Sequence, residues 1–330
     1  MDTMNKTVYG LLILTLLLLA ACGGAAVDVE EATATPEPAG ALDTLAPPSP
    51  TAVPPTATAT ATATALPPTA TPSPLPPTAT ATPDIAERAP TFEVAYVPAG
   101  DQLNVRTDPD PDAEIAGTLR LWQGDVEVTG EGEQVGEHLW LPIEAGDLSG
   151  WVNSLYLTEM VPPDDFCEDE ATEELVEAFR EAVAGEDEGA LAELIDPDRG
   201  LRVRVSWWNP EVWLLGEEVE NLLSSDTEHD FGFEDGSGNP IEGSFQDVIL
   251  PMFERDLLPA DERACNEILH GGTAGIVQLP EEVEGLNYYA FYRPPGPDQV
   301  EMDWGTWVVG VERWQGEYQI AFLVHFAWEI

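Results

Sequence analysis

The sequence predicts a multidomain chain: a short apolar N-terminal segment, a disordered linker rich in Thr and Pro, a small all-β barrel, and an α+β domain with an antiparallel sheet. Three observations support this fold class. Residues 28–90 contain no aromatic residue and many Pro, Thr and Ala residues. From Phe92 onward, short alternating segments are separated by Gly, Pro and Asp, which is typical of small β domains. After residue 160, helical periodicity comes first and long β patterns come last.

The charge of the chain excludes one class of partner. The 330 residues include 62 Asp and Glu against 12 Lys and Arg, which gives a net charge of -50. Nucleic-acid binding requires basic surface, so we expect no nucleic-acid partner. Three Cys are too few for a zinc ribbon or for a scaffold of several disulfides. A hydrophobic content of 43% is nevertheless enough to build a core.

The N-terminus carries the signature of an exported protein. Residues 11–21 form an apolar run that ends in small residues. A membrane-spanning helix needs about 20 apolar residues, so this run is too short and fits the hydrophobic region of a secretory signal. The segment Leu19-Ala20-Ala21-Cys22-Gly23 resembles the lipobox of bacterial lipoproteins. That resemblance implies that residues 1–21 are a signal peptide and that Cys22 becomes the lipidated first residue.

Lipidation of Cys22 would place the protein at the cell membrane, anchored on its extracytoplasmic face. Two acyl chains give stable anchoring, whereas one chain binds only marginally. Two alternatives stay open, namely an ordinary signal peptide that contains a Cys, or an uncleaved anchor. Residues 22–90 would then form a disordered linker, because they have too little apolar bulk to offset the entropy of ordering. This linker is either O-glycosylated or an unmodified tether.

Residues 91–160 are expected to form the barrel. The segments that carry a resemblance appear in a fixed order: 103–106 (Leu-Asn-Val-Arg), 115–119 (Ile-Ala-Gly-Thr-Leu), 124–128 (Gly-Asp-Val-Glu-Val), 140–143 (Trp-Leu-Pro-Ile) and 150–157 (Gly-Trp-Val-Asn-Ser-Leu-Tyr-Leu). This order resembles the bacterial Src-homology-3-like (SH3-like) domain. The resemblance implies a groove between loops that binds cell-wall peptidoglycan or a protein ligand. Candidate ligand-binding residues are Trp122, Trp140 and Tyr156, with Trp122 expected to be exposed.

Residues 161–330 are expected to form the α+β domain. Apolar residues at 175, 176, 179, 182 and 183 predict a helix over 171–183 that ends at Gly185. A short helix from Asp187, a strand over 201–205, a helix over 217–224 and a helix over 245–257 that is interrupted near Pro251 follow. Strands are expected over 286–293, 304–313 and 317–328. This element order is similar to the nuclear-transport-factor-2-like cone, which implies a concave pocket.

Few residues of this domain form a pattern that indicates catalysis or ligand binding. The sequence contains no nucleophile elbow, phosphate loop or zinc-protease helix, so we expect no catalytic residue, metal or cofactor. His325 lies on an apolar strand and is a candidate ligand-binding residue. It could pair with Asp303 or Tyr288 as an acid/base dyad, although a satisfied core His is the more usual situation. Cys167 and Cys265 are expected to form a disulfide outside the cytoplasm, with two buried thiols as the alternative.

The sequence therefore favours a surface-anchored lipoprotein whose SH3-like module binds cell-wall peptide or an extracytoplasmic protein. The C-terminal domain would bind a ligand or a protein. The expected partners are the cell membrane, through the lipid anchor, and peptidoglycan or an envelope protein. The alternatives are an extracytoplasmic hydrolase that the SH3-like module directs to the cell wall, and a structural envelope protein without a small ligand.

Overall fold

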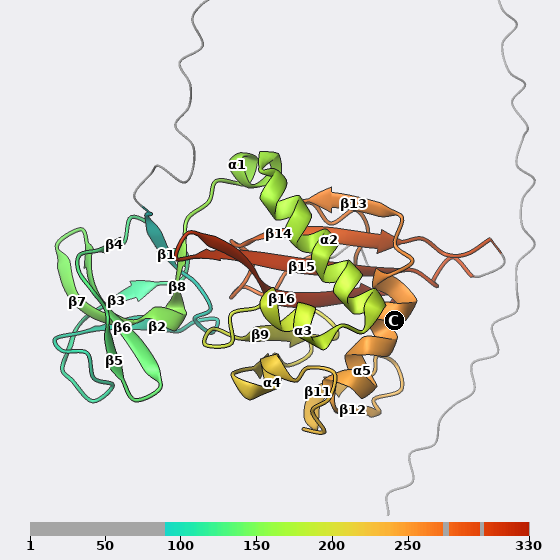
Figure 1. Cartoon of the computed structure of the whole chain (residues 1–330), viewed down its shortest axis with the longest axis horizontal. Helices are drawn as coiled ribbons and strands as arrows, with labels where there is room; N and C mark the ends of the chain where they lie inside the picture. Colours follow the sequence, from blue (N-terminus) through green and yellow to red (C-terminus); the bar gives the residue numbers. More distant parts are fainter. Residues whose placement is uncertain (1–89, 273–276, 298–299, 330) are drawn as a thin grey trace, which may run out of the picture. The chain divides into compact units, whose positions relative to one another are not determined.

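A computed structural model describes residues 90–272, 277–297 and 300–329. The predicted signal peptide, Cys22 and nearly all of the predicted linker lie outside the described residues. The described residues belong to one compact unit, Pro77–Ile330. We call residues 91–160 the first module and residues 161–330 the second module. Figure 1 shows the first module as a group of short strands and the second as a larger sheet with helices.

The first module is all-β. Its main sheet has the strand order β3-β2-β7-β6-β4, with β5 beside β6, and β1 pairs separately with β8. Every pairing in it is antiparallel. The elements are β1 (Phe92–Val94), β2 (Gln102–Arg106), β3 (Ile115–Arg120), β4 (Glu127–Val128), β5 (Glu133–Val135), β6 (His138–Ala145), β7 (Leu148–Asn153), the 3-10 turn η2 (Ser154–Tyr156) and β8 (Leu157–Glu159).

One expected strand of the first module is broken into three elements. The pattern over 150–157 suggests a single strand, but the chain turns at η2 between β7 and β8. The side chain of Asn153 accepts a hydrogen bond from the backbone N–H of Leu155 and closes this turn. The break sends β8 back to β1, so that the two ends of the module are paired.

The second module is α+β, and its sheet is mixed. The strand order is β10-β9-β16-β15-β14-β13. We expected an antiparallel sheet, but β9 and β16 run parallel, with Leu323 opposite Val203. The elements are α1 (Pro163–Glu168), α2 (Glu170–Gly185), α3 (Glu188–Glu193), β9 (Leu201–Arg204), β10 (Val212–Leu214), α4 (Glu217–Glu220), β11 (His229–Phe233), β12 (Pro240–Gly243), α5 (Phe245–Met252), the π-helical turn η3 (Phe253–Leu257), β13 (Glu262–Cys265), β14 (Asn287–Arg293), β15 (Gly305–Trp314) and β16 (Glu317–Ala327).

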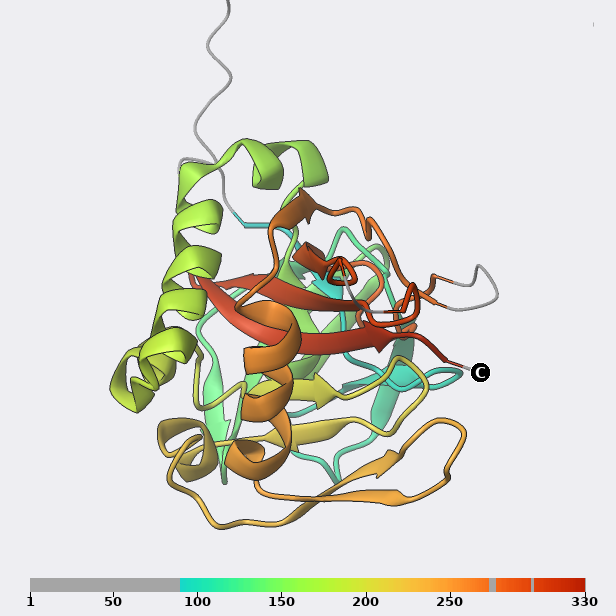
Figure 2. The same cartoon turned by 90° about the vertical axis from the view of Figure 1, so that its right-hand side faces the viewer.

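The helices α2 and α5 pack on one face of this sheet, as Figures 1 and 2 show. The N-terminus of α2 is capped by the side chain of Asp169, which accepts a hydrogen bond from Ala171 N–H. The predicted helix over 171–183 is confirmed. Helix α5 passes into the π-helical turn directly after Pro251, so the predicted interruption is also confirmed. Pro lacks a backbone N–H and disturbs the hydrogen-bond ladder around it.

Strand β16 is covered on both faces, as its apolar pattern predicts. Leu323 packs into the core beneath the helices, whereas Phe322 and Val324 pack into a second core on the other side. The pairing register between β15 and β16 shifts between Gly310 and Val311. The alternation of β16 side chains between the two faces of the sheet therefore changes phase at Ala321. Ile320 therefore shares a core with Leu323 and not with Phe322, which strict alternation does not predict.

A buried ion pair connects the two modules. Glu312 of β15 accepts hydrogen bonds from Arg199 Nε and Nη2, both at 2.7 Å, and from the Tyr96 hydroxyl at 3.0 Å. Arg199 also donates to the backbone carbonyls of Ser154 and Leu157 in the first module. Burial alone would raise the pKa of Glu312, but the charge and hydrogen bonds of Arg199 outweigh it and hold that pKa below its usual range. The pair therefore stays ionised in the interior.

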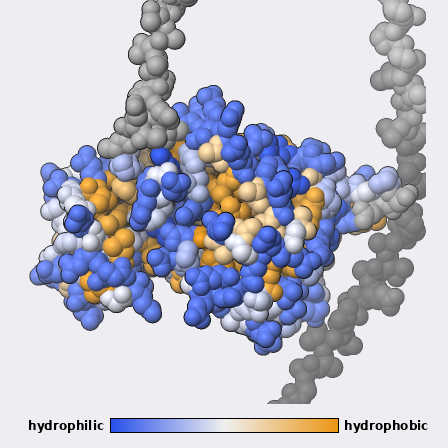
Figure 3. Space-filling view, viewed as in Figure 1, coloured by the Kyte–Doolittle hydropathy of each residue, from blue (hydrophilic) through white to orange (hydrophobic). Residues whose placement is uncertain are grey.

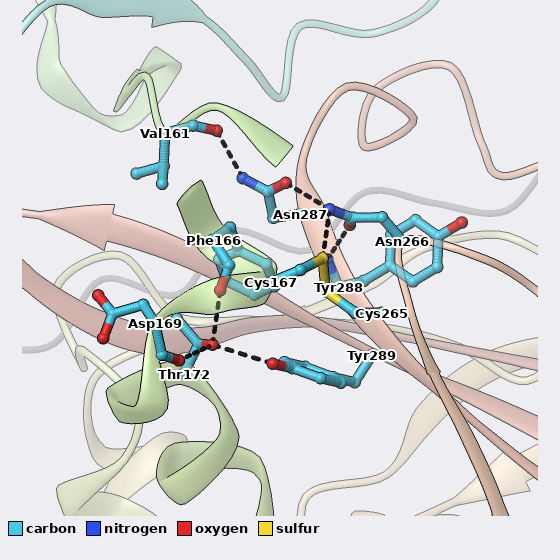
Figure 4. Close-up of a disulfide and its surroundings, with 10 residues drawn as sticks. All are labelled: Val161, Phe166, Cys167, Asp169, Thr172, Cys265, Asn266, Asn287, Tyr288 and Tyr289. Carbon is cyan, nitrogen blue, oxygen red and sulfur yellow. Dashed lines mark hydrogen bonds between the residues drawn. A yellow bond between two sulfur atoms is a disulfide. The ribbon is translucent and has the colours of Figure 1, made fainter. Parts of the chain in front are cut away.

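Cys167 of α1 and Cys265 of β13 form a disulfide, as expected, with their Cα atoms 5.9 Å apart. Figure 4 shows the bond beside Asn266 and Asn287. Asn266 Nδ2 donates to Asn287 Oδ1, and Asn287 Nδ2 donates to the carbonyl of Val161, both at 2.8 Å. The disulfide and these amides fix the start of the second module to the edge of its sheet.

The surface is mainly hydrophilic on the face seen in Figure 3, with apolar residues in separate groups. The large number of acidic residues accounts for this polarity. No helix in the described part of the chain combines the length and apolar character needed to cross a membrane.

Candidate functional site

The first module contains a pocket of about 320 Å³. It is formed where β2, the start of β6 and the turn η2 come together. Trp140 and Tyr156, two of the predicted ligand-binding residues, both line it. The polar side chains of its wall include Asp101, Asn104, Arg106, His138 and Asn153. The pocket is therefore lined by aromatic side chains and by charged side chains of both signs.

Trp140 is the main aromatic side chain of this pocket. It is only 5% exposed, and its indole Nε1 has no hydrogen-bond partner among the described residues. A buried donor without an acceptor costs about 1–3 kcal/mol relative to a satisfied one. Tyr156 is half-buried, and its ring also contacts the cores of both modules.

The electrostatics of the pocket differ from those of the module around it. Residues 91–160 carry 14 acidic residues and only two basic residues, Arg106 and Arg120, not counting His. Arg106 lines the pocket, and its Nη1 donates to the carbonyl of Ala113 at 2.7 Å, which holds the guanidinium in place. With Asp101 nearby in the same wall, the pocket offers one fixed charge of each sign. A zwitterionic peptide has matching charges.

Trp122, the third predicted ligand-binding residue of the first module, does not line this pocket. Its indole Nε1 donates to the carbonyl of Glu281 at 2.9 Å, and its ring lies against Gly285, where a Cβ would come within 2.6 Å of it. The side chain is half-buried in the contact between the two modules, not exposed as we expected. Trp122 is therefore a packing residue, because the loop over residues 277–286 covers it.

The second module contains a larger pocket, of about 490 Å³, and His325 lies in its wall. The partner of His325 is Asp256 of the π-helical turn, at 2.8 Å from Nε2, and not Asp303 or Tyr288. Tyr288 packs in the core on the opposite face of the sheet. Asp303 pairs instead with Arg293.

Asp256 is fully buried and is the centre of a charged network. Arg255 Nε and Nη2 donate to its Oδ2 at 2.9 and 2.8 Å, and Arg293 Nε donates to its Oδ1 at 2.9 Å. Burial by itself would raise the pKa of Asp256. The hydrogen bonds from His325 and Arg255 and their charges outweigh that effect, so the pKa lies well below its usual range. Gly305 makes room for the carboxylate, since a Cβ there would lie 2.3 Å from Asp256 Cγ.

This geometry does not fit a hydrolytic triad centred on His325. The second ring nitrogen of His325, Nδ1, faces the carbonyl oxygen of Val205 at 3.3 Å. Both ring nitrogens thus face oxygen acceptors, and neither is placed to take a proton from a nucleophile. Ser206 lies in the same pocket, but its hydroxyl donates to Glu329. A Ser-His-Asp arrangement requires one imidazole nitrogen on the serine.

Sequence reasoning missed three residues of this second pocket. Trp208, Phe233 and Trp328 all line it, and all three are exposed. They occur at the ends of elements, where hydrophobic periodicity gives no signal. A useful indication in the sequence is the pair Trp207-Trp208, which directly follows a strand and precedes a turn.

Neither pocket shows a metal site. Within the residues that the structure describes, no group of three or more His, Cys, Asp and Glu side chains is arranged to hold a metal ion. Comparison of the chain with protein-family models, with curated proteins and with solved structures found no match. Function must therefore be inferred from the two pockets and from the sequence.

Proposed function

We propose that the first module is an SH3-like domain that binds peptide of the cell wall, in a protein anchored by lipid on Cys22 at the extracytoplasmic face of the membrane. The observation that carries this proposal is the pocket that brings Trp140 and Tyr156 together with Arg106 and Asp101. Aromatic walls with a few placed polar groups are typical of small-ligand sites. The order of the sequence motifs supports the fold assignment, and the disulfide supports an oxidising location.

Cell-wall peptide suits this pocket better than the anionic polymers of the wall do. The chain is strongly acidic, so it repels anionic polymers at long range. A short stem peptide instead carries a carboxylate and an amine together. Arg106 would receive the carboxylate and Asp101 the amine, and the aromatic side chains of Trp140 and Tyr156 would pack against the apolar part of the peptide.

Co-sedimentation of the intact chain with purified peptidoglycan sacculi tests the proposal. The wild-type chain should pellet with the sacculi, and the variants Trp140→Phe and Arg106→Gln should pellet at least about tenfold less well. Trp140→Phe retains one aromatic ring and removes the pyrrole part of the indole together with its N–H. Arg120→Gln is the matched control, because it removes the other Arg of the module from an exposed site outside the pocket.

Two results would overturn the peptide proposal. If no protein pellets at any salt concentration, the first module does not bind the wall, and an extracytoplasmic protein becomes the partner to seek. If Trp140→Phe and Arg106→Gln pellet as well as Arg120→Gln does, binding occurs outside this pocket.

The lipid anchor needs a separate test. Detergent phase partitioning should place the mature wild-type chain in the detergent phase and the Cys22→Ser variant in the aqueous phase, because only Cys22 would carry acyl chains. Equal partitioning of the two proteins would contradict lipidation at Cys22. Incorporation of a radiolabelled fatty acid provides a second measurement, with the same variant as its control.

A further inference from the structure

The exposed aromatic side chains of this protein are gathered in one place. Among the Trp, Phe and Tyr residues that the structure describes, only Trp208, Phe233 and Trp328 are exposed. They come from three separate segments: the loop after β9, the end of β11 and the residue after β16. All three line the pocket of about 490 Å³ in the second module. An association of this kind points to a ligand and not to chance exposure.

Hydrogen bonds hold two of these three residues in position. Trp208 Nε1 donates to Glu329 Oε1 at 2.9 Å, and Asn209 fixes Phe233 by accepting from its N–H at 3.0 Å and donating to its carbonyl at 3.1 Å. Asn209 is 2% exposed, so this clamp is buried. No aromatic ring or Arg in the described part of the chain stacks on any of the three rings.

The charges around the rings determine which ligands fit. The lining includes four carboxylates, Glu234, Asp235, Asp247 and Glu329, against one guanidinium, Arg255. The guanidinium pairs with the buried Asp256, and the four carboxylates outnumber it in the lining. Hydrogen bonds from Ser237 and Asn239 lower the pKa of Glu234 and keep it ionised. Anionic ligands are therefore repelled, and cationic ligands are attracted.

We propose that this pocket binds an organic ammonium ion, with the cation against the faces of Trp208, Phe233 and Trp328 and the carboxylates around it. Aromatic rings attract cations through the negative potential of their faces, and Trp does so most strongly. The volume lies within the range of about 300–1,000 Å³ that is usual for small-molecule sites. The site is separate from the peptide pocket of the first module and shares no lining residue with it.

Calorimetric titration of the intact chain with four probes tests the proposal. The cations 1,5-diaminopentane and tetramethylammonium should bind, whereas the neutral sugar N-acetylglucosamine and the anion benzoate should not. Binding of the two cations should weaken as salt is added, because carboxylates supply part of the attraction. Tetramethylammonium cannot donate hydrogen bonds, so its binding reports on the aromatic faces and the charge alone.

Two substitutions locate the binding. Trp208→Ala should weaken the binding of tetramethylammonium about tenfold, within the range expected for a cation at a Trp face. Asp247→Asn keeps the shape of the pocket and removes one charge, and it should weaken the binding of both cations. Glu131→Gln, an exposed acid of the first module, is the control for the loss of one charge and should leave both affinities unchanged.

The outcomes are distinct. Absence of cation binding, or equal binding by wild-type and Trp208→Ala proteins, would overturn the proposal. Tighter binding of N-acetylglucosamine than of either cation would also overturn it and would assign the aromatic faces to a sugar. If Trp208→Ala fails to fold, Phe233→Leu provides the second test, because its side chain is 52% exposed.

Discussion

The disulfide between Cys167 and Cys265 allows one stability prediction to be worked through. Replacing both residues with Ala removes a link between positions 98 residues apart in the sequence. In the chain-entropy model the loss of stability depends on the length of the loop that the bond closes in the unfolded chain. A loop of this length corresponds to about 4.7 kcal/mol at 25 °C.

The folded state should survive the substitution, since only one amide contact around the bond, from Asn266 Nδ2 to Cys167 Sγ at 3.5 Å, depends on sulfur. Asn287 would still hold the carbonyl of Val161, and Phe166 of α1 would still be buried in the core. Most of the loss of stability should therefore come from the greater conformational freedom of the unfolded chain. We expect a decrease of about 3–5 kcal/mol in the free energy of unfolding.

Urea unfolding of the intact chain, followed by Trp fluorescence, measures this decrease. Each single variant, Cys167→Ala or Cys265→Ala, should lose as much stability as the double variant, because either change removes the whole bond. Cys22→Ser is the control and should match the wild type. A decrease of less than about 1 kcal/mol would refute the reasoning, because it would mean that the bond does not restrict the unfolded chain.

Further stability predictions follow from the buried carboxylates. Burial raises the pKa of Glu93 from 4.5 to about 7, so the folded state retains this proton longer than the unfolded state does, and stability should fall as pH rises from 4.5 to 7. Glu93→Gln should remove up to about 3 kcal/mol of that pH dependence, as measured by urea unfolding at several pH values. Asp256→Asn should cost about 3–5 kcal/mol, because it leaves the buried His325 without its charged partner and Arg293 with Asp303 alone; a cost below about 1 kcal/mol would contradict the network. Glu312→Gln should cost a similar amount by leaving the buried Arg199 unpaired, and an unchanged unfolding midpoint would contradict the proposed link between the modules.

Long periodic segments of this chain were predictable. The helix α2 and the strands β14, β15 and β16 occur where the sequence places them, because each has enough residues to show its period. Strands β10, β11, β12 and β13 were missed; each has only three to five residues, and none shows the clear alternation that marks β9. The parallel pairing of β9 with β16 joins segments about 120 residues apart, and no local pattern encodes such a pairing.

The candidate sites were predictable only in part. Trp140 and Tyr156 could be found because they occur within strand motifs of the first module. The partner of His325 could not, because Asp256 is positioned by the π-helical turn after Pro251. Trp208 and Phe233 were missed for a related reason: they lie where strands end, and only the fold brings them to one pocket.

The most direct test of the central claim is the affinity of the Trp140 pocket for a soluble stem peptide of the cell wall. Calorimetry should detect binding of this peptide to the intact wild-type chain, and Trp140→Phe should weaken that binding about tenfold because it removes part of the aromatic wall of the pocket. Arg120→Gln should bind as the wild type does. Absence of binding, or equal affinities for the wild type and Trp140→Phe, would contradict the claim that this pocket recognises wall peptide.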